Sequence, residues 1–238
     1  MLSEVAKTGL PEVARRDGAE QFLLWQLADS AFPTGGFAHS GGLEAAWQHG
    51  EVRSSQDLTA FSEASLIQFS QSALPLMLAV HADPARLPEL DQFFDVFTSN
   101  HVANRASRLQ GRALLSSAER VFALPQLTVL RPGGGSEPPC AHFAAIFGVV
   151  ANSLEVGREN AGRLFLFGHL RGIVSSAVRL GVVGPLEAQA LQFRLSPSLE
   201  SLLARFLDFP VDQITQTAPL LDLWQGTQDR LYSRLFQS

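Results

Sequence analysis

A glycine-rich stretch at residues 31–44, AFPTGGFAHSGGLE, constrains the fold more than any other part of the sequence. Four glycines and a proline separate two helical patterns; glycine reaches positive φ easily, while proline fixes its own φ. Unlike a flexible linker, the stretch also contains Phe32, Phe37 and Leu43, whose burial is favourable. These features predict a rigid, shaped loop that displays backbone groups between two helices.

Three kinds of chemistry are considered for this loop. A phosphate-binding P-loop requires the pattern GxxxxGK[ST], and the only lysine in the chain is Lys7. Nucleophilic or metal chemistry at His39 and Ser40 lacks a carboxylate spaced to orient the imidazole. A histidine among glycines is more often a structural hydrogen-bonding group. The residues therefore favour a recognition or packing loop.

Residues 23–46, LLWQLADSAFPTGGFAHSGGLEAA, resemble the N-terminal signature of the UreF family of urease accessory proteins. That signature joins a helix ending in LADS to a Pro-x-Gly-x-Phe-x-His-Ser-x-Gly-Leu-Glu segment. The resemblance runs to the C-terminal helix, is strongest at 23–46, 101–115 and 158–189, and departs locally at Thr34, Ala38 and Gly41. The candidate partner-binding residues of the loop are Pro33, Gly35, Gly36, Phe37, His39, Ser40, Gly42 and Glu44.

Helical patterns with capping residues follow one another along nearly the whole chain, and no β-alternation of useful length appears. We expect helices at 21–29, 43–49, 54–80 with a kink or break at Pro75, 83–97, 100–122, 140–155, 159–180, 185–195, 196–208 and in the last twenty residues. The fold class is therefore all-α, a single-domain bundle of roughly nine or ten helices in two packed halves. The resemblance implies the same class.

The domain organisation follows from where these patterns lapse. Residues 1–18 have no apolar core of a signal peptide and are expected to form a mobile leader before an all-helical domain at 19–238. The stretch 123–139, which contains RPGGGSEPP, predicts a surface loop. Residues 219–238 form a C-terminal helical tail.

Charge and cysteine content limit the class of partner and compartment. The 18 basic and 23 acidic residues give a net charge of −5, which argues against nucleic acid or an anionic membrane as the main partner. Cys140 is the single cysteine, so the chain can form no internal disulfide. Polar residues interrupt every long apolar run, so no membrane helix is expected. We expect a cytoplasmic protein.

An arginine face is the clearest charged pattern. His101, Arg105, Arg108 and Arg112 follow at steps of four, three and four, so they share one side of a helix. Such a face is usually only solvated, although guanidinium groups also suit bidentate contact with an acidic partner. Residues 101–115 also resemble the corresponding region of the UreF family. The candidate partner-binding residues on this face are therefore Arg105, Arg108 and Arg112.

Small residues recur on two later helices. They are Ala144, Gly148 and Ala151 on the first, and Gly168, Gly172 and Ser176 on the second. Small residues at this spacing let helix axes approach closely. A tight core within the chain is favoured over a contact between subunits.

The last twenty residues carry large apolar groups near one face. Docking of this helix on its own domain is slightly favoured over a tail that becomes ordered only on a partner. The resemblance associates the C-terminal segment with complex formation, which adds Trp224, Leu231, Tyr232 and Leu235 to the candidate partner-binding residues.

Catalytic patterns are largely absent. The six histidines show no tight metal-ligand spacing, and no nucleophile has an evident activating base, so we expect a non-enzyme with no stably bound cofactor. The resemblance implies a homodimeric maturation factor for the nickel enzyme urease. It would bridge the accessory protein UreD, which contacts apo-urease, and the GTPase UreG, which delivers nickel, so that the complex handles the metal.

Two other functions remain open. One is activation of the GTPase by an arginine finger from Arg105, Arg108 or Arg112. The other is a nickel conduit in which His39 or His142 contacts the ion transiently.

Overall fold

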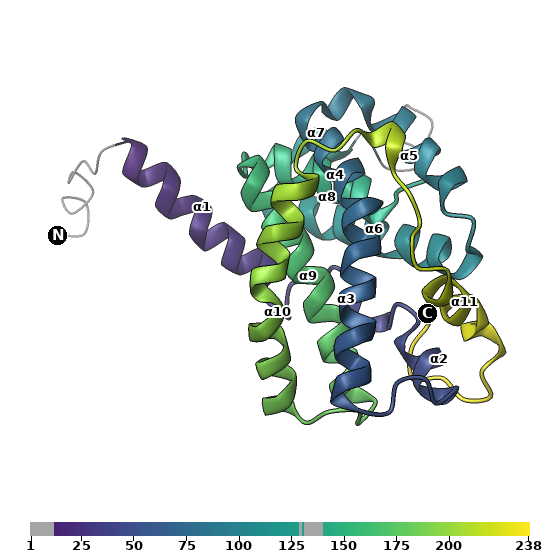
Figure 1. Ribbon diagram of the computed structural model, residues 1–238. Coiled ribbons are helices and arrows are strands. Elements are labelled where there is room, and N and C mark those ends of the chain that lie inside the picture. The colour runs from purple at the N-terminus through teal and green to yellow at the C-terminus, as the bar shows by residue number, and fades with distance from the viewer. Residues whose placement is uncertain (1–11, 129, 131–139) are drawn as a thin grey trace. The chain divides into compact units, whose positions relative to one another are not determined.

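The computed structural model describes residues 12–128, 130 and 140–238 (Figure 1). The chain divides into two compact units, residues 1–32 and residues 33–238. The first unit contains α1 (Glu12–Ala28), in which the rings of Phe22 and Trp25 meet edge to face at 5.1 Å. The helix starts at Glu12 and not at Gln21, so part of the expected leader is helical. Good helix formers continue upstream of Gln21, and Gly18 alone does not end the helix.

The second unit is built mainly from helices. They are α2 (Leu43–Gln48), α3 (Ser55–Gln71), α4 (Ala73–Ala82), α5 (Leu87–Phe97), α6 (His101–Phe122), α7 (Pro125–Thr128), α8 (Phe143–Ser153), α9 (Arg158–Arg179), α10 (Pro185–Phe206) and α11 (Pro219–Thr227). The described residues contain no strand, and nine of their α-helices, α1 included, have nine or more residues. The all-α prediction is confirmed.

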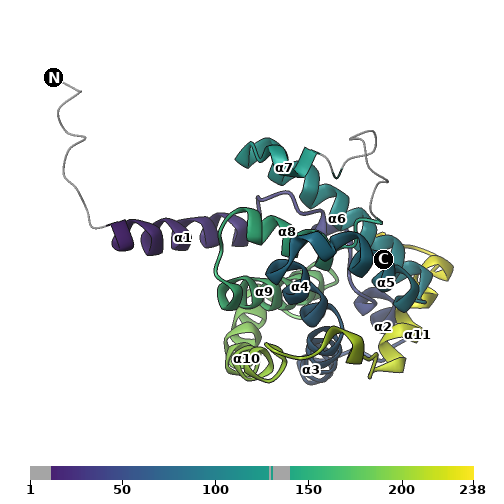
Figure 2. The ribbon, with the colours of Figure 1, turned by 90° about the horizontal axis from the view of Figure 1, so that it is seen from above.

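The centre of this unit is the packing of α8 against α4 and α6. Helix α4 is apolar on every side, and Leu74, Leu76 and Met77 are completely buried. The three helices α3, α9 and α10 contact one another and are seen nearly end-on in Figure 2. Because α4 and α6 precede the 123–139 stretch and α8 follows it, the two halves of the chain share one core. The predicted surface loop at 123–139 was wrong at Pro125–Thr128, which form α7 with Leu127 buried, and residues 129 and 131–139 lie outside the described residues.

Glycines on α8 and α9 behave differently. A Cβ at Gly148 would press on the backbone of α4, so the small residues of α8 permit close packing within the chain, as predicted. A Cβ at Gly168 or Gly172 would meet no heavy atom within 4 Å. The prediction of a tight internal contact was therefore wrong at these two glycines of α9, because no atom of another described element lies against the position of their Cβ.

Two prolines act differently from what the sequence predicts. The break between α3 and α4 falls at Ser72, and Pro75 lies in the first turn of α4, where its missing N–H is not needed. The predicted break at Ser196 and Pro197 was wrong, because α10 continues through Pro197. Buried Leu195 and Leu199 on either side of the proline hold this helix against the core.

Candidate partner-binding surface

The glycine loop, from Pro33 to Gly42, lies between α6 and α11. Gly35, Gly41 and Gly42 have φ values of 76°, 62° and 88°, a region that favours glycine. A Cβ at Gly35 would lie 3.1 Å from the Ala113 side chain of α6, and one at Gly42 would lie 3.1 Å from Gln225 of α11. Glycine is thus required for both backbone shape and close approach, as expected of a shaped loop.

Phe37 projects from the loop and is supported by Arg179. The Phe37 side chain is 72% exposed, and the guanidinium carbon of Arg179 lies 3.7 Å from the centre of its ring. The same guanidinium lies 4.1 Å from the ring of Phe236 and donates a hydrogen bond to the Phe37 carbonyl. A cation between two aromatic faces therefore joins the loop, the end of α9 and the C-terminal segment.

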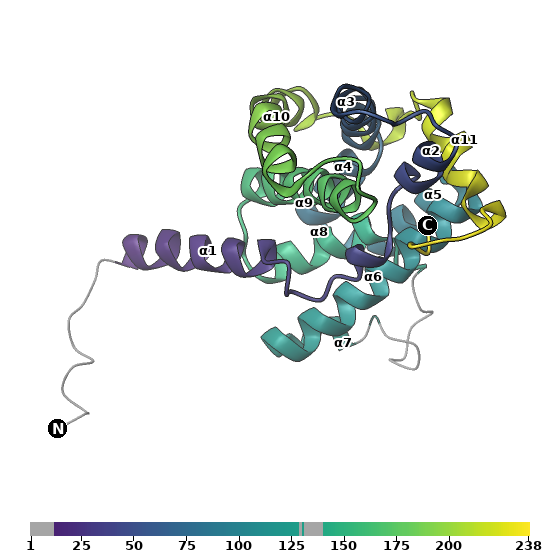
Figure 3. The same cartoon turned by 90° about the horizontal axis from the view of Figure 1, so that it is seen from below.

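The C-terminal segment, residues 228–238, runs beside the glycine loop (Figure 3). The Ser40 amide donates to the Ser238 carbonyl at 2.5 Å, and the Gln237 amide donates to the Ala38 carbonyl at 2.8 Å. His39 Nδ1 lies 2.6 Å from Ser238 Oγ. Burial, followed by the charge of Arg105, lowers the pKa of His39 and favours the neutral imidazole. His39 thus makes a structural hydrogen bond, and its contact with nickel stays a prediction.

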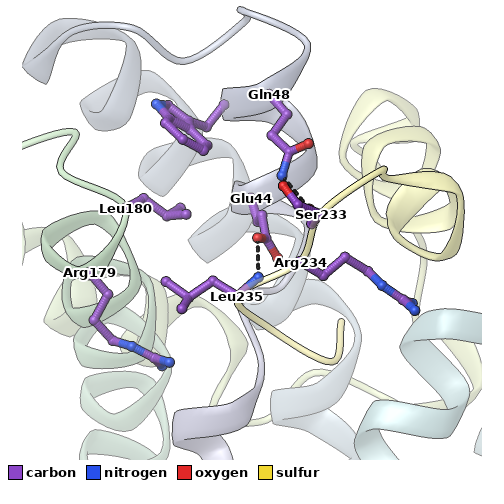
Figure 4. Close-up of a pocket in the computed structure, with 8 residues that line it drawn as sticks. Glu44, Gln48, Arg179, Leu180, Ser233, Arg234 and Leu235 are labelled. Carbon is purple, nitrogen blue, oxygen red and sulfur yellow. Dashed lines mark hydrogen bonds between the residues drawn. The ribbon is translucent and has the colours of Figure 1, made fainter.

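Glu44 fixes the same segment to α2 (Figure 4). Its buried carboxylate accepts hydrogen bonds from the amides of Leu235 and Phe236 at 2.6 and 3.1 Å and from Gln228 Nε2 at 2.6 Å. Three donors on one buried carboxylate form a strong, directional contact. With its oxygens occupied in this way, Glu44 is poorly suited to act as a catalytic base.

A cavity of about 320 Å³ opens between α2, the end of α9 and the C-terminal segment. Gln48 closes one side by donating to the Ser233 carbonyl at 2.8 Å. The cavity combines apolar side chains with two guanidinium groups, and Figure 4 draws the residues that line it: Glu44, Trp47, Gln48, Arg179, Leu180, Ser233, Arg234 and Leu235.

The arginine face of α6 is divided among different partners. Arg105 forms two hydrogen bonds of 3.0 and 2.8 Å with Asp229, which also pairs with Arg234 at 3.2 Å. The bond from Arg105 is the main cause that lowers the pKa of Asp229. Arg108 lies 3.5 Å from Asp95 of α5. Arg105 therefore stabilises the C-terminal segment within the chain.

Arg112, the last residue of this face, is exposed. Within the described part of the chain, no hydrogen bond or ion pair engages its guanidinium. It is the arginine of the three that is most available to another protein.

Helix α11 docks on its own domain, as the sequence slightly favoured, but the predicted helical tail at 219–238 was wrong beyond Thr227, since only a 3₁₀ turn at Gln228–Arg230 and non-helical backbone follow. Leu221 is buried, and the ring of Trp224 stacks on Phe61 at 6.1 Å. Leu231 is half-buried, whereas Tyr232 is fully exposed and Leu235 is 53% exposed. Inward-facing residues thus hold the segment while Tyr232 and Leu235 face solvent.

His142 lies apart from this surface, at the start of α8. Its side chain is completely buried, with Nε2 3.0 Å from Asp95 Oδ1 and Nδ1 3.1 Å from Ser107 Oγ. Both ring nitrogens of His142 are thus engaged within the chain. A transient contact between His142 and nickel stays a prediction. No group of three or more His, Cys, Asp or Glu side chains in the described residues is placed to share a metal ion.

Several residues of the surface were not identified from the sequence. Arg179, Gln228, Asp229 and Phe236 lie far from the glycine loop in the chain, and no motif marks them. Their role depends on the path of the C-terminal segment. Separately, no helix in the described ranges is long and apolar enough to cross a membrane.

Comparison with known proteins identifies the family. The UreF family model matches residues 52–196, from the connection before α3 into α10. The chain belongs to the UreF family. It is 38% identical to urease accessory protein F of Arabidopsis thaliana, over 95% of this chain and 96% of that protein.

Other UreF proteins match along most of their length. Urease accessory protein F of Oryza sativa subsp. indica is 38% identical over 89% of this chain and 83% of the relative. Urease accessory protein UreF of Trichodesmium erythraeum is 29% identical over 92% of this chain and 97% of the relative. Family membership supports a general role in urease maturation.

Proposed function

We propose that this protein is a cytoplasmic, non-enzymatic scaffold for urease maturation. It would bridge a UreD-like protein bound to apo-urease and a UreG-like GTPase, so that the complex delivers nickel to the urease active site. Nickel is here the cargo of the assembly, with no stably bound cofactor in the chain itself.

The observation that carries this proposal is the convergence of predicted partner-binding residues on one surface. Glu44 and Ser40 hold the C-terminal segment against the glycine loop, while Arg105 holds it against α6 through Asp229. Phe37, Tyr232 and Leu235 project from the surface built in this way. Exposed aromatic and apolar side chains on a well-fixed backbone are typical of binding hot spots.

A homodimer is part of the proposal, and α9 offers a place for its contact. The open face at Gly168 and Gly172 would let a helix of a second copy approach closely. Gly168→Leu should therefore convert a dimer to a folded monomer, as measured by light scattering and circular dichroism, and its melting temperature should fall only by the stabilisation that association supplied. A variant that remains dimeric would place the contact elsewhere.

The bridging role is tested by light scattering on a sizing column. The protein is mixed with the UreD-like protein and the nickel-loaded, GTP-bound UreG-like protein. We expect one stoichiometric complex, and separate elution under every nucleotide condition would contradict the proposed function.

Variants then test the surface itself. Replacing both Tyr232 and Leu235 with Ala should weaken complex formation at least about tenfold, since neither side chain is buried in the free protein. The matched control is Val96→Ala, which truncates another exposed apolar residue, on α5. Equal loss in the control, or no loss in the double variant, would show that another surface makes the contact.

The second candidate function is activation of the GTPase, and the exposure of Arg112 favours it. An arginine finger must reach the nucleotide of another protein, and Arg112 is the arginine of its face without a partner in the described residues. Arg112→Ala should then abolish any stimulation of single-turnover GTP hydrolysis while leaving complex formation intact. Loss of stimulation with Arg105→Ala alone would indicate a different finger.

A further inference from the structure

The start of α8 is held by a buried polar cluster that the proposed function does not use. This cluster, here called the α8 latch, consists of Asp91 and Asp95 of α5, Ser107 of α6, and His142. The Asp91 and His142 side chains are 1% and 0% exposed. Asp91 and His142 therefore have their polar groups paired where water does not reach them, whereas the Asp95 side chain is 32% exposed at the edge of the latch.

Asp91 caps α8 from another helix. Its two carboxylate oxygens accept hydrogen bonds from the backbone amides of Ala141 and His142 at 2.7 and 2.8 Å. Ser107 Oγ accepts a third bond from the amide of Phe143 at 3.1 Å. His142 is the N-cap of α8 and Phe143 its first residue, so their amides have no partner within the helix, and Ala141 immediately precedes them. Helices α5 and α6 thus fix where α8 begins.

The hydrogen bonds of His142 suit a neutral ring. Because Ser107 Oγ already accepts from Phe143, its hydroxyl hydrogen can be donated to His142 Nδ1. Nε2–H then donates to Asp95. A proton added at Nδ1 would displace the Ser107 hydroxyl hydrogen and place a cation in a buried site. This tautomer is the one that we assign from the partners of the ring.

The backbone beside His142 is strained. Ala141 has a φ of 65°, in the left-handed region that residues with a Cβ rarely adopt. Its carbonyl also crosses α6 so closely that a Cβ at Gly111 would collide with it. Strained backbone persists only while neighbouring contacts hold it, so the segment should relax when the latch opens.

We propose that the α8 latch is a pH-sensitive switch, closed with neutral His142 and opened when His142 is protonated in mildly acidic solution. Opening would separate the start of α8 from α5 and α6. It would also release Asp95, which lies 3.5 Å from Arg108, and so change the arginine face of α6.

The charges around His142 act in opposite directions. Burial lowers the pKa of His142, whereas Asp95 and Asp91 raise it and Arg108 lowers it again. Burial raises the pKa of Asp91, so protonation of that carboxyl favours the closed state. The Cys140 thiol also faces the two carboxylates, and burial raises its pKa. With the pKa of His142 lowered when closed, acid favours the open state from about pH 6.5 downwards, where a free histidine gains its proton.

Hydrogen–deuterium exchange of the whole protein tests the switch, with rates corrected for the intrinsic effect of pH. As the pH is lowered from 6.5 to 5, the equilibrium constant for opening, measured in peptides that cover residues 87–97 and 140–146, should rise by up to roughly thirtyfold. This corresponds to at most about tenfold per pH unit. Peptides from the middle of α10 should not follow. Unchanged protection at 87–97 and 140–146 would overturn the proposal.

Variants identify the titrating group. Gln at position 142 can donate to Asp95 and accept from Ser107 but cannot be protonated, so His142→Gln should abolish the acid opening. The matched control is His169→Gln, which removes a half-buried histidine that hydrogen-bonds with Ser65 and not with the latch, and which should leave the opening intact. Retained opening in His142→Gln would overturn the proposal.

Direct titration does not depend on whether a variant folds. The ring proton resonances of His142 in the unmodified protein should report a pKa below 6.5, together with a change in the Ala141 amide at the same pH. A pKa at or above 6.5, or titration with no change at Ala141, would contradict the switch. The switch is independent of the proposed function, because both measurements use the chain alone.

Discussion

At the scale of single residues, a few buried polar side chains determine the path of the backbone. Glu44 lies inside the motif that the sequence shares with the UreF family, so its position could be predicted. Its role could not, because its three donors come from residues 228–236, nearly the whole chain away. Motif spacing identifies the residue, whereas only the fold supplies its partners.

His169 gives a prediction at the same scale. Its ring stacks on Phe69 at 3.9 Å and hydrogen-bonds with Ser65 at 2.9 Å, and burial lowers its pKa to about 4. Between pH 6.5 and 4 the unfolded chain therefore binds a proton that the folded chain does not, so stability falls as pH falls. The loss should be at most about 3 kcal/mol.

Urea denaturation at several pH values checks this loss. The slope of unfolding free energy against pH between 4 and 6.5 should be smaller in His169→Gln. The control is His49→Gln, which replaces an exposed histidine. Equal slopes in the unmodified protein and His169→Gln would show that this ring does not control the acid response.

At the scale of helices, local sequence predicts well where a helix begins with its own cap. Ser54 and Asp57 form a capping box at the start of α3, and Asn100 caps α6, close to the predicted starts at 54 and 100. Prediction fails where tertiary packing decides, as at Pro197 in α10. The caps of α8 come from α5 and α6, which no local pattern contains.

Pro197→Ala should stabilise α10. The change supplies an amide hydrogen for the helix and removes the clash of the proline ring with the preceding turn, so stability should rise by about 1 to 3 kcal/mol. Pro185→Ala is the matched control, since Pro185 lies in the first turn, where no helical donor is lost. Calorimetry should show a higher melting temperature for the first variant only. A lower value would indicate that α10 needs the distortion.

At the scale of the whole molecule, the all-α class could be predicted, but the arrangement of the candidate partner-binding surface could not. The glycine loop and the C-terminal segment are joined by bonds such as that between Ser40 and Ser238. Contacts over so long a separation follow from the path of every intervening helix. The sequence therefore indicated the candidate residues but not that Phe37, Arg179 and Leu235 lie close together.

Removal of residues 230–238 tests how far the candidate surface depends on the contact between the glycine loop and the C-terminal segment. Deletion leaves the Glu44 carboxylate without the amides of Leu235 and Phe236, and a buried charge that loses its partners costs about 3 to 5 kcal/mol. Adding Glu44→Leu to the deletion removes that charge and should restore part of the lost stability. The same substitution in the full chain should instead destabilise, because it leaves those amides unpaired.

The full chain, the deletion variant and the Glu44→Leu form of each make a double-mutant cycle, and urea denaturation measures their unfolding free energies. Glu44→Leu should change this free energy with opposite signs in the full chain and in the deletion variant. Glu63→Gln, an exposed acidic residue on α3, is the control and should have the same small effect in both. The stabilised deletion variant separates folding from function, since it lacks Tyr232 and Leu235. If it still forms the complex with the UreD-like and UreG-like proteins, the C-terminal segment serves the fold alone.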